Sequence, residues 1–193
     1  KVLVDAIFEA TTRILPKVGA QNLTTKKIAE LAGVSIGSLY QYFPSKESIL
    51  RQIMEVVSQK HMDRFLDGLA ANSKKSKIEL TDAMVDLAVQ LFLEEREKNR
   101  AIFAMAPELG FVESIVKFRQ DVVKRLAAEM QRLEPGFDTL EYKRASFVAV
   151  NSVMGIIMVM LIDRSQTYSN SELAGELKLL VNSYFAAKLK LQT

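Results

Sequence analysis

The sequence predicts an all-α fold, because apolar residues recur at helical spacing along most of its 193 residues. No segment shows the alternation of apolar and polar residues, bounded by hairpin turns, that is typical of β-strands. Short polar stretches, or stretches with Gly or Pro, separate the apolar-periodic segments, and no internal repeat is visible. The expected helices can therefore be delimited in order along the chain.

The first helix is expected to end at Gly19, since glycine readily adopts the left-handed backbone angles that terminate helices. The segment before it is amphipathic, with apolar residues at Val4, Ile7, Phe8, Ile14 and Leu15. Thr24 is a suitable N-cap for the second helix, because its hydroxyl can accept a hydrogen bond from a free backbone N–H. Leu23 and Ile28 have the spacing of a hydrophobic staple.

A third, very short helix is expected over residues 36–42. Gly33 ends the second helix, and Ser35 is placed to cap the third. Leu39 and Phe43 have the spacing to face the core. Two short helices joined by a tight Gly-containing turn are typical of a helix-turn-helix, which inserts its second helix into the major groove of DNA. An ordinary helical corner shares this outline, but the side chains that follow favour DNA.

Polar side chains of the third helix, and of the segment after it, are suited to contact DNA. Tyr40 and Tyr42 carry hydroxyls for phosphate contacts, which position a protein on DNA without reading its sequence. Gly37 and Ser38 are small enough for the backbone to approach the duplex closely. Lys46 lies in the first turn of the next helix, where its ammonium and the helix N-terminus both attract phosphate.

The segments Thr24–Ala29 and Ala32–Glu47 together resemble the signature of TetR-family transcriptional regulators. No family-wide motif follows in the rest of the chain. The resemblance implies an all-helical homodimer, with an N-terminal three-helix DNA-binding domain and a C-terminal domain for ligand binding and dimerisation. It also implies that operator DNA is contacted by Thr25, Lys26, Ser35, Gly37, Ser38, Tyr40, Tyr42 and Lys46.

Few of these side chains can make paired hydrogen bonds to a base edge. Lys26 and Gln41 are the main polar candidates for base contacts. Ile36 adds an apolar side chain that can meet a thymine methyl group. Ile36 and Gln41 therefore join the expected DNA-binding residues.

The distribution of charge agrees with this placement. The net charge is +3, and residues 1–61 contain eight Lys or Arg against five Asp or Glu. The rest of the chain is balanced, so the excess positive charge lies in the expected DNA-binding part.

Composition argues against an enzyme and against a bound metal or cofactor. The chain has no cysteine and one histidine, His61, which is expected at a solvent-facing or hinge position. It shows no Gly-rich phosphate loop and no acidic constellation at metal-ligand spacing. A cysteine-free chain suits a reducing cytoplasm, and the early charge at Asp5 argues against a signal peptide. Because the chain does not begin with methionine, an N-terminal arm can precede Lys1.

A long helix over residues 45–71, capped by Ser45, is expected to link two domains. The DNA-binding domain is predicted at residues 1–50, and the ligand-binding and dimerisation domain at residues 51–193. The further expected helices are residues 78–96, 99–106, 112–133, 139–164 and 171–191.

The segment Val153–Ile162 is ten residues without a polar side chain, too short to span a bilayer, so no membrane contact is expected. A helix that is apolar on every side has to be buried on every side, and a second copy of the chain is the simplest cover. The last helix, with capping-box spacing at Ser169 and Glu172, would complete a four-helix homodimer interface. The expected interface residues are Ser152, Gly155, Ile156, Val159, Leu177, Val181 and Tyr184.

Methionine and phenylalanine are abundant between residues 84 and 160. Methionine fills irregular space and tolerates varied ligands, which favours an adaptable apolar pocket, although plain core packing uses the same residues. Asn151 can orient a ligand or form a hydrogen bond across the dimer, and Arg119 and Gln90 are further polar candidates. The candidate ligand-binding residues are Phe92, Phe103, Met105, Phe118, Phe147, Asn151, Met154 and Met158.

These observations predict a dimeric, sequence-specific DNA-binding transcriptional regulator, most simply a repressor that a small apolar or amphipathic ligand releases from operator DNA. The alternative is the same DNA-binding domain controlled by a protein partner. A closed, ligand-sized cavity would favour the ligand. A filled core with an exposed apolar groove would favour the protein partner.

Overall fold

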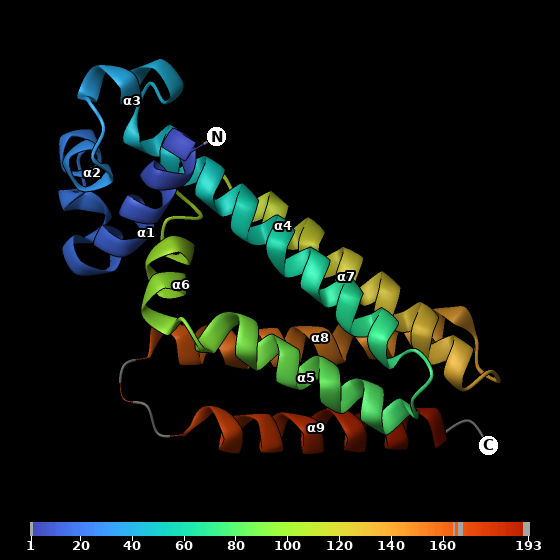
Figure 1. Cartoon of the computed structure of the whole chain (residues 1–193). Coiled ribbons are helices and arrows are strands. Elements are labelled where there is room, and N and C mark those ends of the chain that lie inside the picture. The colour runs from blue at the N-terminus through green and yellow to red at the C-terminus, as the bar shows by residue number, and fades with distance from the viewer. Residues whose placement is uncertain (1, 164, 166–167, 191–193) are drawn as a thin grey trace. The chain divides into compact units, whose positions relative to one another are not determined.

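The computed structural model describes residues 2–163, 165 and 168–190, and every regular element within them is an α-helix (Figure 1). This confirms the predicted all-α class. The chain divides into two compact units. Unit 1 comprises Lys1–Lys60 and Glu95–Val112, and unit 2 comprises His61–Glu94 and Glu113–Thr193. The two units differ from the predicted domains, which had a single boundary after residue 50. Residues 95–112 belong to unit 1, because they pack with the N-terminal helices.

Unit 1 contains α1 (Val2–Asn22), α2 (Thr25–Ala32), α3 (Ile36–Tyr42), the N-terminal part of α4 (Lys46–Asn72) and α6 (Arg96–Phe103). Helix α1 packs against α2 and α6, and α2 packs against α3. The side chains that are at most 1% exposed in this unit include Ile7, Leu15, Leu23, Ile28, Leu39, Ile49 and Ile102.

Local signals set most helix ends of unit 1 where the sequence predicts them. Gly33, with φ +69°, ends α2 as expected, whereas Gly19, with φ +73°, interrupts the helical backbone of α1 but does not end the helix, which continues to Asn22. Thr24, Ser35 and Ser45 each accept a hydrogen bond from the backbone N–H three residues later, at 3.2, 2.9 and 3.2 Å. All three predicted caps are therefore confirmed.

Unit 2 contains the C-terminal part of α4 with α5 (Lys77–Leu93), α7 (Val112–Leu133), α8 (Thr139–Ile162) and α9 (Asn170–Lys190). Helix α5 packs against both α8 and α9, and α8 packs against α9, so these three lie side by side (Figure 1). The helices expected after α3 agree with the observed bounds to within two residues, except that α5 ends three residues earlier than expected and α6 both begins and ends three residues earlier.

Two capping boxes begin helices of unit 2. Glu172 N–H donates to Ser169 Oγ at 3.2 Å, and Ser169 N–H donates to the Glu172 carboxylate at 2.9 Å, as predicted. Ser76 and Glu79 form the same pair at the start of α5. The hydrogen bonds from each serine side chain and backbone hold the pKa of Glu79 and of Glu172 below its usual value.

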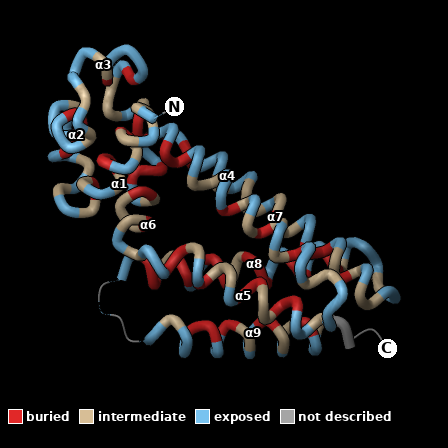
Figure 2. Tube along the Cα trace, in the orientation of Figure 1, coloured by how far each residue is buried: buried red, intermediate tan, exposed pale blue. Residues whose placement is uncertain are grey.

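Helix α8 is the core helix of unit 2. Tyr142, Ala145 and Ile157 are fully buried, and Figure 2 shows buried positions along the whole helix. Within the described residues, α8 is also the one helix long and apolar enough to cross a membrane, but half of its most apolar window is buried inside the fold. A single helix of this kind is weak evidence for a membrane span.

His61 corrects one expectation, since the structure places it in the interior. His61 is 6% exposed, and the centroid of its ring lies 4.8 Å from that of the Phe92 ring. The sequence could not show this, because the aromatic partner comes from another helix.

Candidate DNA interface and ligand cavity

The two sides of α3 differ sharply in burial. Leu39 is fully buried and Phe43 is 3% exposed, so together they seat the helix on the core of unit 1, as expected. The opposite side carries Ile36, Tyr40 and Tyr42, which are 43%, 50% and 55% exposed. Exposure of aromatic and apolar side chains on a short helix leaves them available to a partner.

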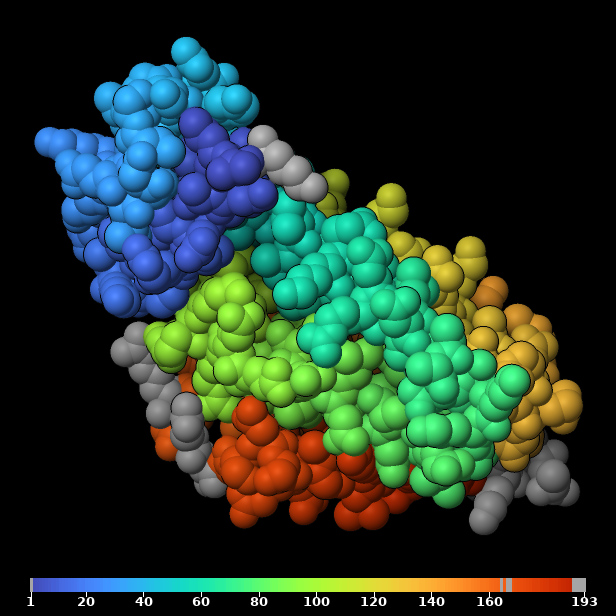
Figure 3. All heavy atoms as spheres, in the orientation of Figure 1, coloured from blue at the N-terminus to red at the C-terminus, as the bar shows by residue number. Residues whose placement is uncertain are grey.

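A hydrogen bond joins α2 to α3 on this exposed side. The hydroxyls of Thr25 and Tyr40 lie 3.0 Å apart. Thr25 and Tyr40 line a surface hollow together with Lys26 and Ile36. Glu30 is the one acidic residue in the lining of this hollow. Thr25, Lys26, Ile36 and Tyr40 are therefore brought together on the surface of unit 1. The N-terminal helices of this unit are blue in Figure 3.

The small residues at the start of α3 lie at the exposed end of the helix. Ser35 caps it, and its Oγ also lies 2.8 Å from Ser38 Oγ. A side chain at Gly37 would meet nothing closer than Ser35 Oγ at 3.8 Å. Gln41 is exposed one turn further on. The backbone of this turn is thus accessible to a large partner.

Lys46 has a role within unit 1 that sequence reasoning missed. Its Nζ donates to the carbonyl oxygen of Ala20 at 3.0 Å, which ties the start of α4 to the last turn of α1. The partners are 26 residues apart, so no local pattern signals the contact. Lys46 is half-buried, and it begins α4, the helix that follows α3 in the chain.

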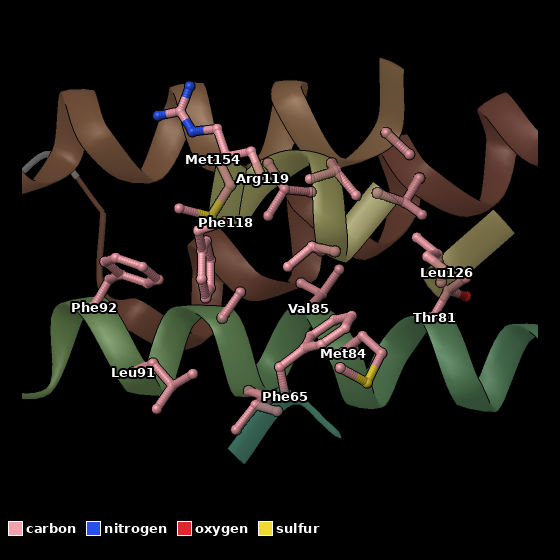
Figure 4. Close-up of a pocket in the computed structure, with 17 residues that line it drawn as sticks. Phe65, Thr81, Met84, Val85, Leu91, Phe92, Phe118, Arg119, Leu126 and Met154 are labelled. Atoms are coloured by element: carbon pink, nitrogen blue, oxygen red, sulfur yellow. The ribbon is translucent and has the colours of Figure 1, made fainter. Parts of the chain in front are cut away.

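Unit 2 contains a partly open apolar cavity of about 80 Å³ (Figure 4). Arg119 is the one charged side chain in its lining. Thr81, the other polar one, is hydrogen-bonded to Asn182 and to its own helix. The lining residues are Phe65, Thr81, Met84, Val85, Leu87, Ala88, Leu91, Phe92, Phe118, Arg119, Val122, Leu126, Ala149, Val150, Val153, Met154 and Val181.

The structure brings only some predicted ligand residues to this cavity. Phe92, Phe118 and Met154 line it. Phe103 and Met105 lie at the end of α6 and just after it, in unit 1, so they are not part of it. The aliphatic lining was missed, because Val, Leu and Ala at helical spacing look the same whether they face a cavity or a filled core.

An open groove of about 620 Å³ lies between α7 and α8 of unit 2. Phe147 lines this groove and not the cavity, and it is 58% exposed. Asn151 also lines it, and its Nδ2 donates to the Phe147 carbonyl at 2.8 Å, so the amide is engaged by its own helix. Met158 lines neither space. The groove residues are Val116, Arg119, Gln120, Val123, Lys124, Lys143, Arg144, Phe147, Val148 and Asn151.

The outer side of α8 carries most of the predicted dimer residues. Ile156 and Val159 are 37% and 63% exposed, and Ser152 is half-buried beside them. Apart from the neighbouring backbone of α8 itself, no heavy atom of the described residues lies within 4 Å of the position a Cβ would take at Gly155. This side of α8 is therefore apolar and uncovered within one protomer.

Leu177 and Val181 of α9 need correction as interface residues. They are 1% and 4% exposed, because α9 turns them toward α5 and α8 of the same chain. The exposed apolar residues of α9 are instead Leu179 and Leu180, at 64% and 44%. Tyr184 is half-buried, with its ring next to that of Phe185.

Comparison with known proteins places these two units in one family. A family profile described as "Bacterial regulatory proteins, tetR family" matches residues 7–53. A second, described as "Tetracyclin repressor-like, C-terminal domain", matches residues 79–185. The first covers the helix-turn-helix, and the second covers the helices that line the cavity except α4, which contributes Phe65.

Individual relatives are more distant. The chain is 27% identical over 135 residues to the nucleoid occlusion factor SlmA of Actinobacillus pleuropneumoniae serotype 5b (strain L20), covering 70% of this chain and 58% of SlmA. It thus spans less than two thirds of that relative. The transcriptional regulator PksA of Bacillus subtilis (strain 168) is 36% identical over 61 residues, which cover 32% of this chain and 30% of PksA.

Two solved structures share the fold along nearly the whole chain. A Mesorhizobium loti MAFF303099 protein described as a TetR-family transcriptional regulator superposes with TM-score 0.77 at 18% identity, covering 96% of each chain. The fatty acid degradation regulator FadR of Bacillus halodurans superposes with TM-score 0.70 at 20% identity, covering 93% of this chain and 94% of FadR. At these identities the likeness concerns the fold.

Within the residues that the structure describes, no group of three or more His, Cys, Asp or Glu could hold a metal ion. The two profiles together account for both compact units, and proteins of this family are DNA-binding regulators and not enzymes. The chain therefore belongs to the tetR family of bacterial regulatory proteins, and is a DNA-binding transcriptional regulator.

Proposed function

We propose that the protein is a homodimeric repressor that binds operator DNA in the cytoplasm through α2 and α3, and leaves it when a small apolar or amphipathic molecule binds unit 2. The observation that carries the proposal is the position of Phe65. This residue lines the cavity of unit 2 and belongs to α4, which begins at Lys46 in unit 1. A ligand that displaces Phe65 therefore acts on the helix that directly follows the helix-turn-helix.

In this proposal α3 lies in the major groove of the operator. Ile36 meets a thymine methyl group, and Lys26 and Gln41 contact base edges. Tyr42 and Lys46 hold phosphates on either side of the groove. The Thr25–Tyr40 hydrogen bond supports this arrangement, because it keeps both hydroxyls on the exposed side of the unit.

Dimerisation sets the spacing between two copies of α3. The exposed apolar side of α8, around Gly155 and Val159, is the proposed contact between protomers. A dimer reads two half-sites on one duplex, so its recognition helices must lie about 34–36 Å apart or a multiple of this. Ligand binding that changes the separation lowers operator affinity without competing for DNA.

The coupling between ligand and operator is reciprocal. If the ligand weakens operator binding, operator DNA must weaken ligand binding by the same factor. A coupling free energy of about 1–3 kcal/mol corresponds to a change of roughly 5- to 150-fold in affinity.

The test measures ligand affinity with and without saturating operator. Candidate ligands are first found by the rise in melting temperature that binding to the folded state produces. We expect each regulatory ligand to bind more weakly when operator is present, and equally well when a scrambled duplex is present. Equal affinities with operator and without it, for every ligand found, would exclude control of DNA binding by this route.

A protein partner is the second candidate, and specific observations favour it. The cavity of about 80 Å³ is smaller than the usual 300–1,000 Å³ of ligand pockets, whereas the groove between α7 and α8 is open and larger. The SlmA relatives are named for nucleoid occlusion and not for a small ligand. Two results together would favour this candidate. Ligand and operator would bind independently, and replacing the groove residue Phe147 by Ala would change operator affinity.

A further inference from the structure

We infer that the ligand of unit 2 is an amphipathic anion, whose apolar chain enters the cavity and whose carboxylate or phosphate head is bound by Arg119. This inference rests on the ligand site of the proposed function and names the chemistry of its occupant.

Arg119 lies at the boundary of the two spaces in unit 2. Among the residues that the structure describes, it is the one that lines both the apolar cavity and the groove between α7 and α8. In Figure 4 its guanidinium group points away from the cluster of apolar side chains. Its aliphatic stem therefore forms part of the cavity wall, and its charge is placed at the edge of the cavity.

The guanidinium of Arg119 has an unsatisfied donor. Its Nε is buried from solvent and has no hydrogen-bond partner in the described part of the chain. A buried donor without a partner is destabilising, and more so when it belongs to a cation. A carboxylate or phosphate satisfies Nε–H and a neighbouring N–H together, in the forked geometry that guanidinium prefers.

The groove beside Arg119 is positively charged. Lys124, Lys143 and Arg144 also line it, and its lining contains no acidic side chain. Glu141 pairs with Arg144 at 2.7 Å and so offsets that one charge. Cationic side chains around an apolar opening raise the local concentration of anions and disfavour cationic ligands.

The rest of the cavity wall suits an alkyl chain. Apart from Arg119, its one polar side chain is Thr81, which is already hydrogen-bonded. Met84 and Met154 are unbranched and can change rotamer, so the cavity can enlarge from its present volume when a chain enters. A ligand that is apolar at both ends would leave the donor of Arg119 unsatisfied.

The test compares four probes, each built on a straight twelve-carbon chain (the carboxyl carbon of dodecanoate included) and each used below the concentration at which it forms micelles. Dodecanoate and dodecyl phosphate carry an anionic head, dodecanol a neutral one and dodecyltrimethylammonium a cationic one. Calorimetry with the full chain should give tighter binding of the two anions than of the alcohol, and the weakest binding for the cation. The ratio of the two anions then distinguishes a carboxylate ligand from a phosphate ligand.

Arg119→Met should weaken binding of both anions by about ten- to hundredfold and leave dodecanol unchanged, since a hydrogen bond to a charged group is lost. The matched control is Arg125→Met, at an exposed position of the same helix outside both linings. Arg119→Lys keeps the positive charge but loses the forked pair of N–H donors, so its affinity for the two anions should lie between those of the wild type and Arg119→Met. If Arg119→Met lowers the melting temperature, Arg119→Lys provides the comparison in its place.

Wild-type affinity that is equal for dodecanoate and dodecanol, or an Arg119→Met variant that weakens both equally, would overturn the inference. Operator affinity is measured separately in the same samples. Anion binding that leaves operator affinity unchanged would refute the proposed function and not this inference. Release of operator by dodecanol or by the cation, without release by the anions, would refute this inference and not the proposed function.

Discussion

Helices α3 and α8 differ in how their two sides are distinguished. In α3 the neighbours Leu39 and Tyr40 are 0% and 50% exposed, and the polarity of the side chains already separates core from surface. In α8 the near neighbours Ile157 and Val159 are 0% and 63% exposed, although both are apolar. Side-chain polarity therefore decides the orientation of α3, while contacts with α5 and α9 decide that of α8.

The difference extends to what each helix can bind. The exposed side of α3 combines hydroxyls with an apolar group, which suits the mixed surface of a DNA groove. The exposed side of α8 is apolar, which suits another protein surface. The predictions below test this contrast, from the largest expected effect to the smallest.

The largest effect is expected for Gly155→Glu on α8. The new side chain has open space in one protomer, so folding should be unaffected. In a dimer it would place an unpaired charge in an apolar contact, at a cost of about 3–5 kcal/mol. Sedimentation should show monomers with unchanged helix content.

Ala128→Glu, at an exposed position of α7, is the matched control and should stay dimeric. A Gly155→Glu variant that remains dimeric would remove this side of α8 from the interface. The exposed apolar side of α8 would then have no role in binding a second protomer, and its difference from α3 would concern packing within unit 2 only.

On the DNA side, Lys46→Ala should weaken binding to operator and to random DNA alike, and should reduce the salt slope by about one. Its loss also removes the hydrogen bond to Ala20, so the melting temperature should fall slightly. Gel-shift titrations at several salt concentrations measure both affinity and slope. Lys60→Ala makes the same charge change further along α4 and should leave the slope nearly unchanged. A lower melting temperature with unchanged slope would assign Lys46 a structural role only.

A smaller effect is expected from removing single helix caps. Ser35→Ala and Ser169→Ala should each cost about 0.5–2 kcal/mol, because each serine accepts from a backbone N–H at a helix start. Only Ser35→Ala should also weaken operator binding, since Ser35 caps the recognition helix. Denaturant unfolding and gel shifts measure the two effects. Equal loss of DNA binding in both variants would show that cap loss acts through global stability.

The smallest effect concerns the titration of Glu172. Its folded-state pKa is lowered, first by the hydrogen bond from the Ser169 side chain and then by that from the Ser169 backbone. A lowered pKa contributes stability above the unfolded value, and this contribution is lost as pH falls through the folded value. In NMR titrations Ser169→Ala should raise the pKa of Glu172 toward its usual value and leave that of Glu79 unchanged. An unchanged pKa of Glu172 would mean that the backbone N–H alone holds the carboxylate.

Much of the candidate DNA interface could be predicted, because its determinants are local. Thr24, Ser35 and Ser45 lie three residues from the N–H groups they cap, so a short segment contains both partners. The hydrogen bonds of Lys46 to Ala20 and of Thr25 to Tyr40 were missed, since they join residues 26 and 15 positions apart.

The ligand cavity could be predicted only as a region. Phe92, Phe118 and Met154 were found because large side chains at helical spacing are conspicuous. Phe103 and Met105 share that spacing but belong to unit 1, and Leu177 and Val181 are turned inward by α5 and α8. Apolar periodicity shows that a helix has a buried side, but it does not say which neighbour buries it.

The sequence by itself determined the helical class, most of the helix ends, the short third helix and the family, because each follows from short-range chemistry between residues close in the chain. Only the tertiary structure decided which apolar sides of α8 and α9 are covered, and that Arg119 joins the cavity to the groove. The physical reason is that hydrophobic burial is non-directional, so an apolar side chain specifies that it is covered and not by what.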